Sequence, residues 1–155
     1  MDIIIETPKG CRNKYVYDEG LSAFRLKKIL PAGAVFPFDF GFIPGTKGED
    51  GDPLDVLVIM DEPAYPGCVV ECRIIGGLKA QQSKKKKMKE NDRLIAVSTV
   101  SHSYTDVTEL KDVNKNILDE IEHFFVSYNE QEGKEFEPQG WVDEKAAMQL
   151  IKKSK

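Results

Sequence analysis

Three carboxylates crowd into a six-residue stretch at Asp50, Asp52 and Asp55, just ahead of an apolar run. Like charges this close repel one another, so the pattern indicates that a positive ion belongs among them. Gly51 allows a sharp turn, and Pro53 stiffens the chain behind it. Carboxylate oxygens are the ligands that Mg²⁺ prefers, with water and substrate phosphate completing its shell. The segment therefore predicts a site for a hard divalent cation, Mg²⁺ first, with Mn²⁺ or another divalent ion as alternatives.

Other acidic motifs fit this segment poorly. An EF-hand loop counted from Asp50 would need Gly in place of Asp55 and Glu in place of Asp61. A phosphotransferase motif of the D-x-D-x-T kind would need Thr in place of Leu54 and an apolar strand before its first Asp. The plain alternative is an acidic turn held by an Asx-type hydrogen bond. For three aspartates beside a buried strand, we favour the metal site.

Length and composition favour one globular domain over residues 1–155. The chain is long enough to enclose a core, and its 31% charged and 41% apolar residues are typical of such a domain. A net charge of −4 argues against nucleic-acid binding, and no stretch approaches the roughly 20 apolar residues of a membrane span. The N-terminus lacks the cationic region of a secretory signal. Three cysteines give no disulfide framework, so we expect a reducing, cytoplasmic setting.

Residue patterns predict a β-rich body followed by helices. Apolar runs and period-2 alternation predict strands over 2–6, 13–18, 23–30, 54–60, 67–80 and 93–100. The Gly- and Pro-rich stretch 31–53 is predicted to be irregular, yet packed down by its phenylalanines. Helical spacing predicts helices over 114–133 and 142–155. Short strands followed by helices favour an α+β, mainly β fold, a small barrel with helices outside.

A biased segment, 81–92, carries four consecutive lysines, Lys84 to Lys87. A charge run of this kind is most often a solvated loop, and we predict a loop here. The alternative is a positive lip that draws an anionic substrate towards the site.

The segment DGDPLDVLV (50–58) resembles the signature of the family I soluble inorganic pyrophosphatases. Similar segments follow the family's order over nearly the whole chain: PFDFGFIPGT (37–46), PGCVVECRIIGGLK (66–79), LKDVNKNILDEIEHFF (110–125) and GWVDEKAAMQLI (140–151). The resemblance implies a five-stranded, OB-like closed barrel with flanking α-helices. It also implies Mg²⁺-dependent hydrolysis of inorganic pyrophosphate to two phosphates, by a homo-oligomer.

The resemblance implies roles for particular acids of this chain. Metal binding falls to Asp50, Asp52 and Asp55, and Glu6 matches a further acidic site residue. Asp52, the middle aspartate, is the candidate for activating the attacking water.

Phosphate binding is implied for four other residues. Lys14 and Tyr128 match a phosphate-binding lysine and a tyrosine that touches phosphate. Lys28 stands where the family has Arg, so it keeps the charge but loses the bidentate fork. Arg93 stands where the family has Lys.

The chain departs from the family at several acidic positions. Val16 replaces a Glu, and Gln82 and Asn91 replace two metal-binding aspartates. Asp92 lies one residue away from the second, and a one-residue slip sends a strand side chain to the opposite face unless a bulge corrects it. We therefore expect hydrolysis with fewer tightly held ions, a higher Mg²⁺ requirement or a shifted substrate.

Two other functions remain open from these departures. The first is hydrolysis of another phosphoanhydride, a nucleotide or polyphosphate, on the same scaffold. The second is a catalytically silent relative that binds an anion or a partner.

Overall fold

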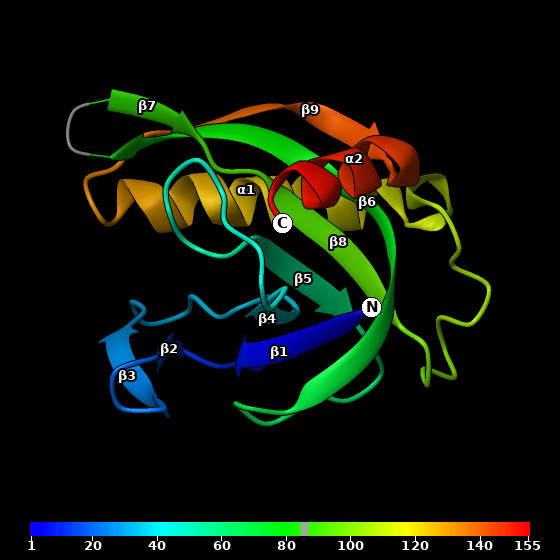
Figure 1. Cartoon of the computed structure of the whole chain (residues 1–155), viewed down its shortest axis with the longest axis horizontal. Coiled ribbons are helices and arrows are strands. Elements are labelled where there is room, and N and C mark those ends of the chain that lie inside the picture. Colours follow the sequence, from blue (N-terminus) through cyan, green and yellow to red (C-terminus); the bar gives the residue numbers. More distant parts are fainter. Residues whose placement is uncertain (85–86) are drawn as a thin grey trace.

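A closed ring of five strands forms the centre of the fold (Figure 1). The computed structural model describes residues 1–84 and 87–155. The ring runs β1 (Asp2–Thr7), β4 (Asp39–Phe42), β5 (Asp55–Ile59), β8 (Arg93–Ser98) and β6 (Val69–Lys84). It closes because the start of β6 pairs with β1, while the rest of β6 pairs with β8. The predicted mainly β fold, built on a five-stranded barrel, is confirmed.

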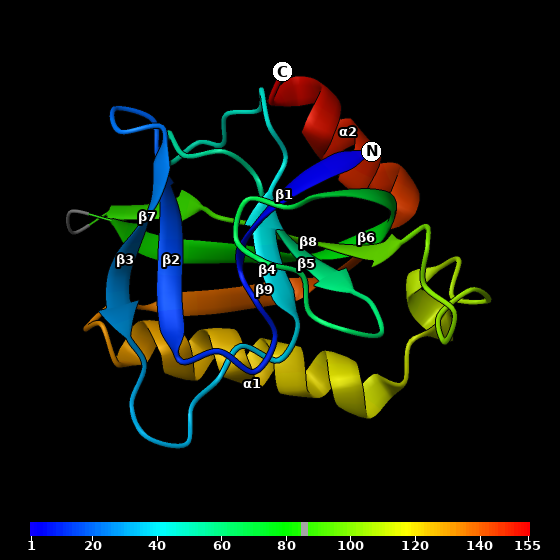
Figure 2. The same cartoon turned by 90° about the horizontal axis from the view of Figure 1, so that it is seen from below.

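The remaining elements surround this barrel. They are the hairpin of β2 (Asn13–Asp18) and β3 (Ala23–Ile29), β7 (Lys87–Glu90), β9 (Phe136–Asp143), a 3₁₀ turn (Leu110–Asp112), α1 (Lys115–Glu130) and α2 (Glu144–Lys153). Both β7 and β9 pair with the far half of β6. Figure 2 shows α1 running along the outside of the barrel, with α2 on another side. Within the described part of the chain, neither helix has the length and apolar character to cross a bilayer.

The strands are buried on two faces, which explains their continuous apolar runs. In β5, Val56 and Val58 belong to a buried cluster that also contains Ala147 and Ile151 of α2. The alternate residue Leu57 belongs to an outer cluster beneath α1. Successive side chains of a strand point to opposite faces, so one strand serves both clusters.

The structure corrects three parts of the predicted secondary structure. Residues 81–84, predicted as loop, extend β6 and pair with β7, so Lys84 and Lys87 are strand residues, while Lys85 and Lys86 lie outside the described residues. The stretch 31–53 contains the short strand β4, whose residues are all buried and therefore show no alternation. β9 was not predicted, because Pro138 and Gly140 argue against a strand.

Gly41 of β4 lies against the backbone of β1, opposite Ile5. A Cβ atom at this position would lie 2.2 Å from the carbonyl oxygen of Ile4. We therefore expect Gly41→Ala to destabilise the fold by about 3 kcal/mol, the upper end for overpacking, because backbone rather than a side chain must move. Urea unfolding measures this, with Gly20→Ala in an exposed turn as the control. Equal unfolding midpoints for the two variants would contradict the strand pairing.

Candidate functional site

Strand register brings two of the predicted site residues face to face. Asp55 begins β5 and Arg93 begins β8, and the parallel pairing of these strands sets the two residues directly opposite each other. Nη1 of Arg93 lies 2.6 Å from Oδ2 of Asp55. Arg93 is 5% exposed, and its guanidinium stacks over the rings of Phe125 and Phe136. The site thus contains an ion pair between a buried guanidinium, which packs on aromatic rings, and a half-buried carboxylate.

A second buried ion pair joins β1 to β2. Nζ of Lys14 lies 3.1 Å from Oε2 of Glu6, and Oε1 of Glu6 accepts the backbone N–H of Tyr17 at 2.8 Å. The ammonium of Lys14 also lies 4.0 Å from the ring centroid of Phe40. Both carboxylate oxygens of Glu6 therefore already have hydrogen-bond donors.

These two pairs influence each other electrostatically. Burial lowers the pKa of Lys14, while the charges of Glu6 and then Asp55 oppose that shift. Burial raises the pKa of Asp55, and the charges of Arg93 and then Lys14 oppose that shift. Two acids and two bases thus form one nearly neutral group of buried charges.

The first two signature aspartates lie on a turn, residues 48–52, which we call the acidic turn. The backbone N–H of Asp52 donates to Oδ1 of Asp50 at 3.0 Å, which is the Asx-type bond of the plain alternative. The N–H of Gly48 donates to the carbonyl oxygen of Asp52 at 2.8 Å. Gly51 has a φ of +92°, so glycine suits this corner. The turn is thus defined by hydrogen bonds within residues 48–52, and it presents the carboxylates of Asp50 and Asp52 close together.

The donor chemistry of the acidic turn and Asp55 suits a hard divalent ion. However, among residues 1–84 and 87–155 no three His, Cys, Asp or Glu side chains gather closely enough to hold a metal ion by themselves. Asp55 also shares an oxygen with Arg93. An ion bound here would therefore need water or phosphate oxygens to complete its shell.

Two amides complete the surroundings of Arg93. Nη1 of Arg93 donates to Oδ1 of Asn91, and Nη2 donates to Oε1 of Gln82 at 3.2 Å. Nδ2 of Asn91 donates to the same Gln82 oxygen at 2.8 Å. Nε of Arg93 is buried and has no hydrogen-bond partner among the residues the structure describes. We call Asp55, Gln82, Asn91 and Arg93 the Arg93 cluster.

Lys28 and Tyr128, both predicted to bind phosphate, lie side by side. Nζ of Lys28 lies 3.6 Å from the ring centroid of Tyr128 and forms an ion pair with Glu132. Glu132 also binds Lys134 at 2.9 Å. Burial would raise the pKa of Glu132, but its bonds with Lys134 and Lys28 hold that pKa below its ordinary value. Glu132 was missed in the sequence because it is 104 positions from Lys28.

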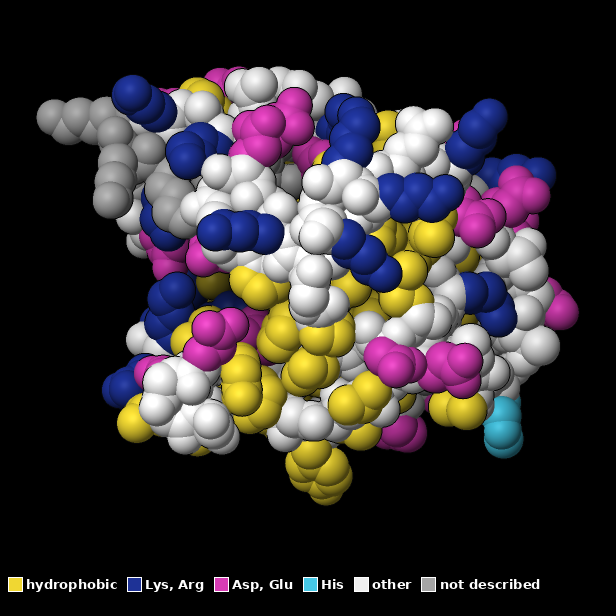
Figure 3. Space-filling model, viewed as in Figure 1, with side chains coloured by type: hydrophobic (Ala, Val, Ile, Leu, Met, Phe, Trp, Pro, Cys, Tyr) yellow, Lys and Arg dark blue, Asp and Glu magenta, His cyan; other side chains and the backbone are white. Residues whose placement is uncertain are grey.

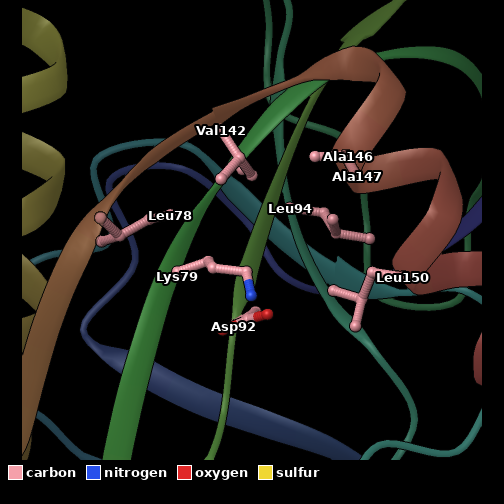
Figure 4. Close-up of a pocket in the computed structure, with 9 residues that line it drawn as sticks. Leu78, Lys79, Asp92, Leu94, Val142, Ala146, Ala147 and Leu150 are labelled. Atoms are coloured by element: carbon pink, nitrogen blue, oxygen red, sulfur yellow. The ribbon is translucent and has the colours of Figure 1, made fainter.

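The side chain of Asp92 points away from the Arg93 cluster, whereas its backbone carbonyl oxygen accepts from Nη1 of Arg93 at 3.3 Å. Its Oδ1 accepts the backbone N–H of Ala80 at 2.9 Å, and its side chain lines a small pocket beside α2. Figure 4 shows it turned towards Lys79, among apolar residues that include Leu94 and Leu150. Asp92 lies in the link between β7 and β8 and not on a strand, and its side chain lies beside α2, so it does not take the place of Asn91 next to Arg93.

Known proteins resemble this chain along almost its whole length. The family model described as inorganic pyrophosphatase matches residues 3–155. The inorganic pyrophosphatase of Halalkalibacterium halodurans is 40% identical over 151 residues, which are 97% of this chain and 90% of that protein. The crystal structure of inorganic pyrophosphatase from Thermus thermophilus superposes with a TM-score of 0.89 at 37% identity, covering 98% of this chain and 87% of that one. The structure of an inorganic pyrophosphatase from Coxiella burnetii superposes with a TM-score of 0.91 at 34% identity, covering 99% of this chain and 92% of that one.

Proposed function

Because the chain belongs to the inorganic pyrophosphatase family, we propose that it hydrolyses inorganic pyrophosphate to two phosphates. The observation that carries this proposal is the position of buried cations beside signature carboxylates, most directly Arg93 against Asp55. Hydrolysis of a phosphoanhydride needs an activated water on one side and fixed positive charge for the phosphates on the other. The site offers residues of both kinds.

Members of this family depend in general on divalent metal ions. We propose that Asp50, Asp52 and Asp55 hold Mg²⁺ in this chain, with Mn²⁺ as an alternative. The proposal includes Glu6, whose carboxylate must then share its oxygens with Lys14 and the N–H of Tyr17. When bound, the ion lowers the pKa of a coordinated water and neutralises phosphate charge.

Asp52 orients the attacking water and accepts its proton. The water oxygen forms a bond to one phosphorus, the bridging P–O bond breaks, and the second phosphate leaves with that electron pair. Lys14 and Arg93 supply the positive charge that binds the phosphate oxygens.

Lys28 and Tyr128, which lie against each other, also bind phosphate. Burial and then the charge of Glu132 raise the pKa of Tyr128, so its hydroxyl stays protonated at neutral pH. A protonated hydroxyl donates a hydrogen bond to a phosphate oxygen, which an ionised one cannot do.

Glu132 competes with the substrate for Lys28. Replacement by the neutral isostere, Glu132→Gln, is expected to lower KM for pyrophosphate by about two- to fivefold, because the ion pair is partly exposed and therefore of modest strength. Steady-state kinetics measures this. Glu130→Gln, at the exposed end of α1, is the matched control and should leave KM unchanged. An increase of KM in Glu132→Gln would show that the carboxylate positions Lys28 instead of competing for it.

A substrate panel tests the proposed function. Phosphate release is measured in Mg²⁺ with pyrophosphate, tripolyphosphate and nucleoside triphosphates at equal concentrations. Pyrophosphate is expected to give the highest kcat/KM. The proposal is rejected if pyrophosphate is the poorest substrate, or if it binds without turnover.

We also propose that the chain acts as a homo-oligomer in the cytoplasm. Apolar side chains reach the surface on the face shown in Figure 3, and Tyr65 is 85% exposed on the turn before β6. A second copy would remove such apolar surface from water. Light scattering on the purified chain measures the assembly mass.

The proposed location in the cytoplasm is supported by the cysteines. All three cysteines of the chain are free, as in a reducing compartment.

A further inference from the structure

The Arg93 cluster directs its oxygen atoms at a guanidinium. Oδ2 of Asp55, Oδ1 of Asn91 and Oε1 of Gln82 all face nitrogen atoms of Arg93. The Gln82 oxygen receives a second donor from Asn91. A metal ion bound between Asp55 and β6 would need these oxygens as ligands. Each of them already accepts from the Arg93 guanidinium or from an amide.

Two aromatic rings also hold the guanidinium in position. Arg93 lies over the rings of Phe125 and Phe136, at 5.2 Å and 5.6 Å from their centroids. Aromatic faces attract a cation, and the surrounding protein leaves the residue 5% exposed. A divalent ion in the same space would meet a buried positive charge at short range, where repulsion is weakly screened.

We infer that Arg93 is a resident cation that fills a cation position of the site, so that a divalent ion binds Asp55 only on the side of the acidic turn. The chain therefore holds fewer divalent ions than it would if the oxygens around Arg93 were not occupied by the guanidinium. This inference rests on the ion proposed for the acidic turn, but it requires no turnover.

Two neutral substitutions of Arg93 test the inference through metal binding. Arg93→Met removes the charge and leaves Asp55 unpaired, and Arg93→Gln removes the charge but keeps a hydrogen-bonding group for the two amides. Each variant is titrated with Mn²⁺ alone, and bound ion is counted by electron paramagnetic resonance and calorimetry. We expect one further Mn²⁺ per chain, or binding at Asp55 that is tighter by roughly tenfold or more.

Two controls separate this effect from a general change in charge. Arg93→Lys keeps the cation and should retain the wild-type number of ions. Arg12→Met makes the same change in net charge at an exposed position, where Arg12 binds only the carbonyl oxygen of Leu30 in the described structure, and should change Mn²⁺ affinity little.

The wild-type chain provides a test that does not depend on the folding of any variant. It is expected to bind a single Mn²⁺ per chain at submillimolar concentration. Two or more ions of similar affinity in the wild type would overturn the inference, as would unchanged or weaker Mn²⁺ binding in the folded neutral variants. Loss of pyrophosphate hydrolysis with the expected Mn²⁺ counts would reject the proposed function alone.

Discussion

Replacing Asp52 by asparagine is expected to lower kcat for pyrophosphate hydrolysis by roughly 10²–10⁴-fold, the range of a general base. Asparagine preserves the size of the side chain and the backbone bonds of the acidic turn, but it cannot accept the proton of the attacking water. Asp52 is exposed, so the thermal midpoint should stay close to that of the wild type. Stopped or continuous phosphate assays at saturating Mg²⁺ measure the loss.

The matched control for this variant is Asp119→Asn, the same substitution at an exposed position of α1. Its kcat should equal the wild-type value. If Asp52→Asn also stayed within threefold of the wild type, Asp52 would have no part in proton transfer.

Truncating Phe125 to alanine is expected to destabilise the fold by about 3–5 kcal/mol, as for other fully buried aromatic residues. Phe125 is 1% exposed, and its ring packs against those of Phe40, Phe124 and Phe136, with centroids at 6.2, 5.3 and 5.8 Å. It also supports Arg93 from below. The variant should therefore lose both stability and, at temperatures where it is folded, phosphate affinity. Urea unfolding and KM measure the two effects.

His123→Ala, two positions earlier on α1 and exposed, is the control for Phe125→Ala. Its effect should stay within about 0.5 kcal/mol. A loss of less than 1 kcal/mol in Phe125→Ala would contradict the packing described for the outer cluster.

The sequence was most informative where one strand or helix shows a single clear period. The alternation in 13–18 predicted β2 with its observed bounds, and the stripe containing Ile121 and Phe125 predicted α1. β9 could not be predicted locally, because it contains Pro138. The missing N–H is tolerated there because β9 pairs with β6 alone, so the strand has a free edge in the described structure.

Site residues were predictable by type, but their partners were not. The signature aspartates are visible as a short motif, whereas the bonds of Gln82 and Asn91 to Arg93 depend on how β6 turns back towards β8. The pairing of Lys28 with Glu132 joins β3 to the segment after α1. Such long-range contacts follow from the three-dimensional fold, and no local pattern encodes them.

The most direct test of metal-dependent pyrophosphate hydrolysis is phosphate release by the purified wild-type chain, followed by ³¹P NMR with Mg²⁺ and again after chelation. We expect many turnovers, two phosphates from each pyrophosphate, and complete loss of turnover when the divalent ion is removed. Pyrophosphate that persists unchanged in both Mg²⁺ and Mn²⁺ would contradict this expectation.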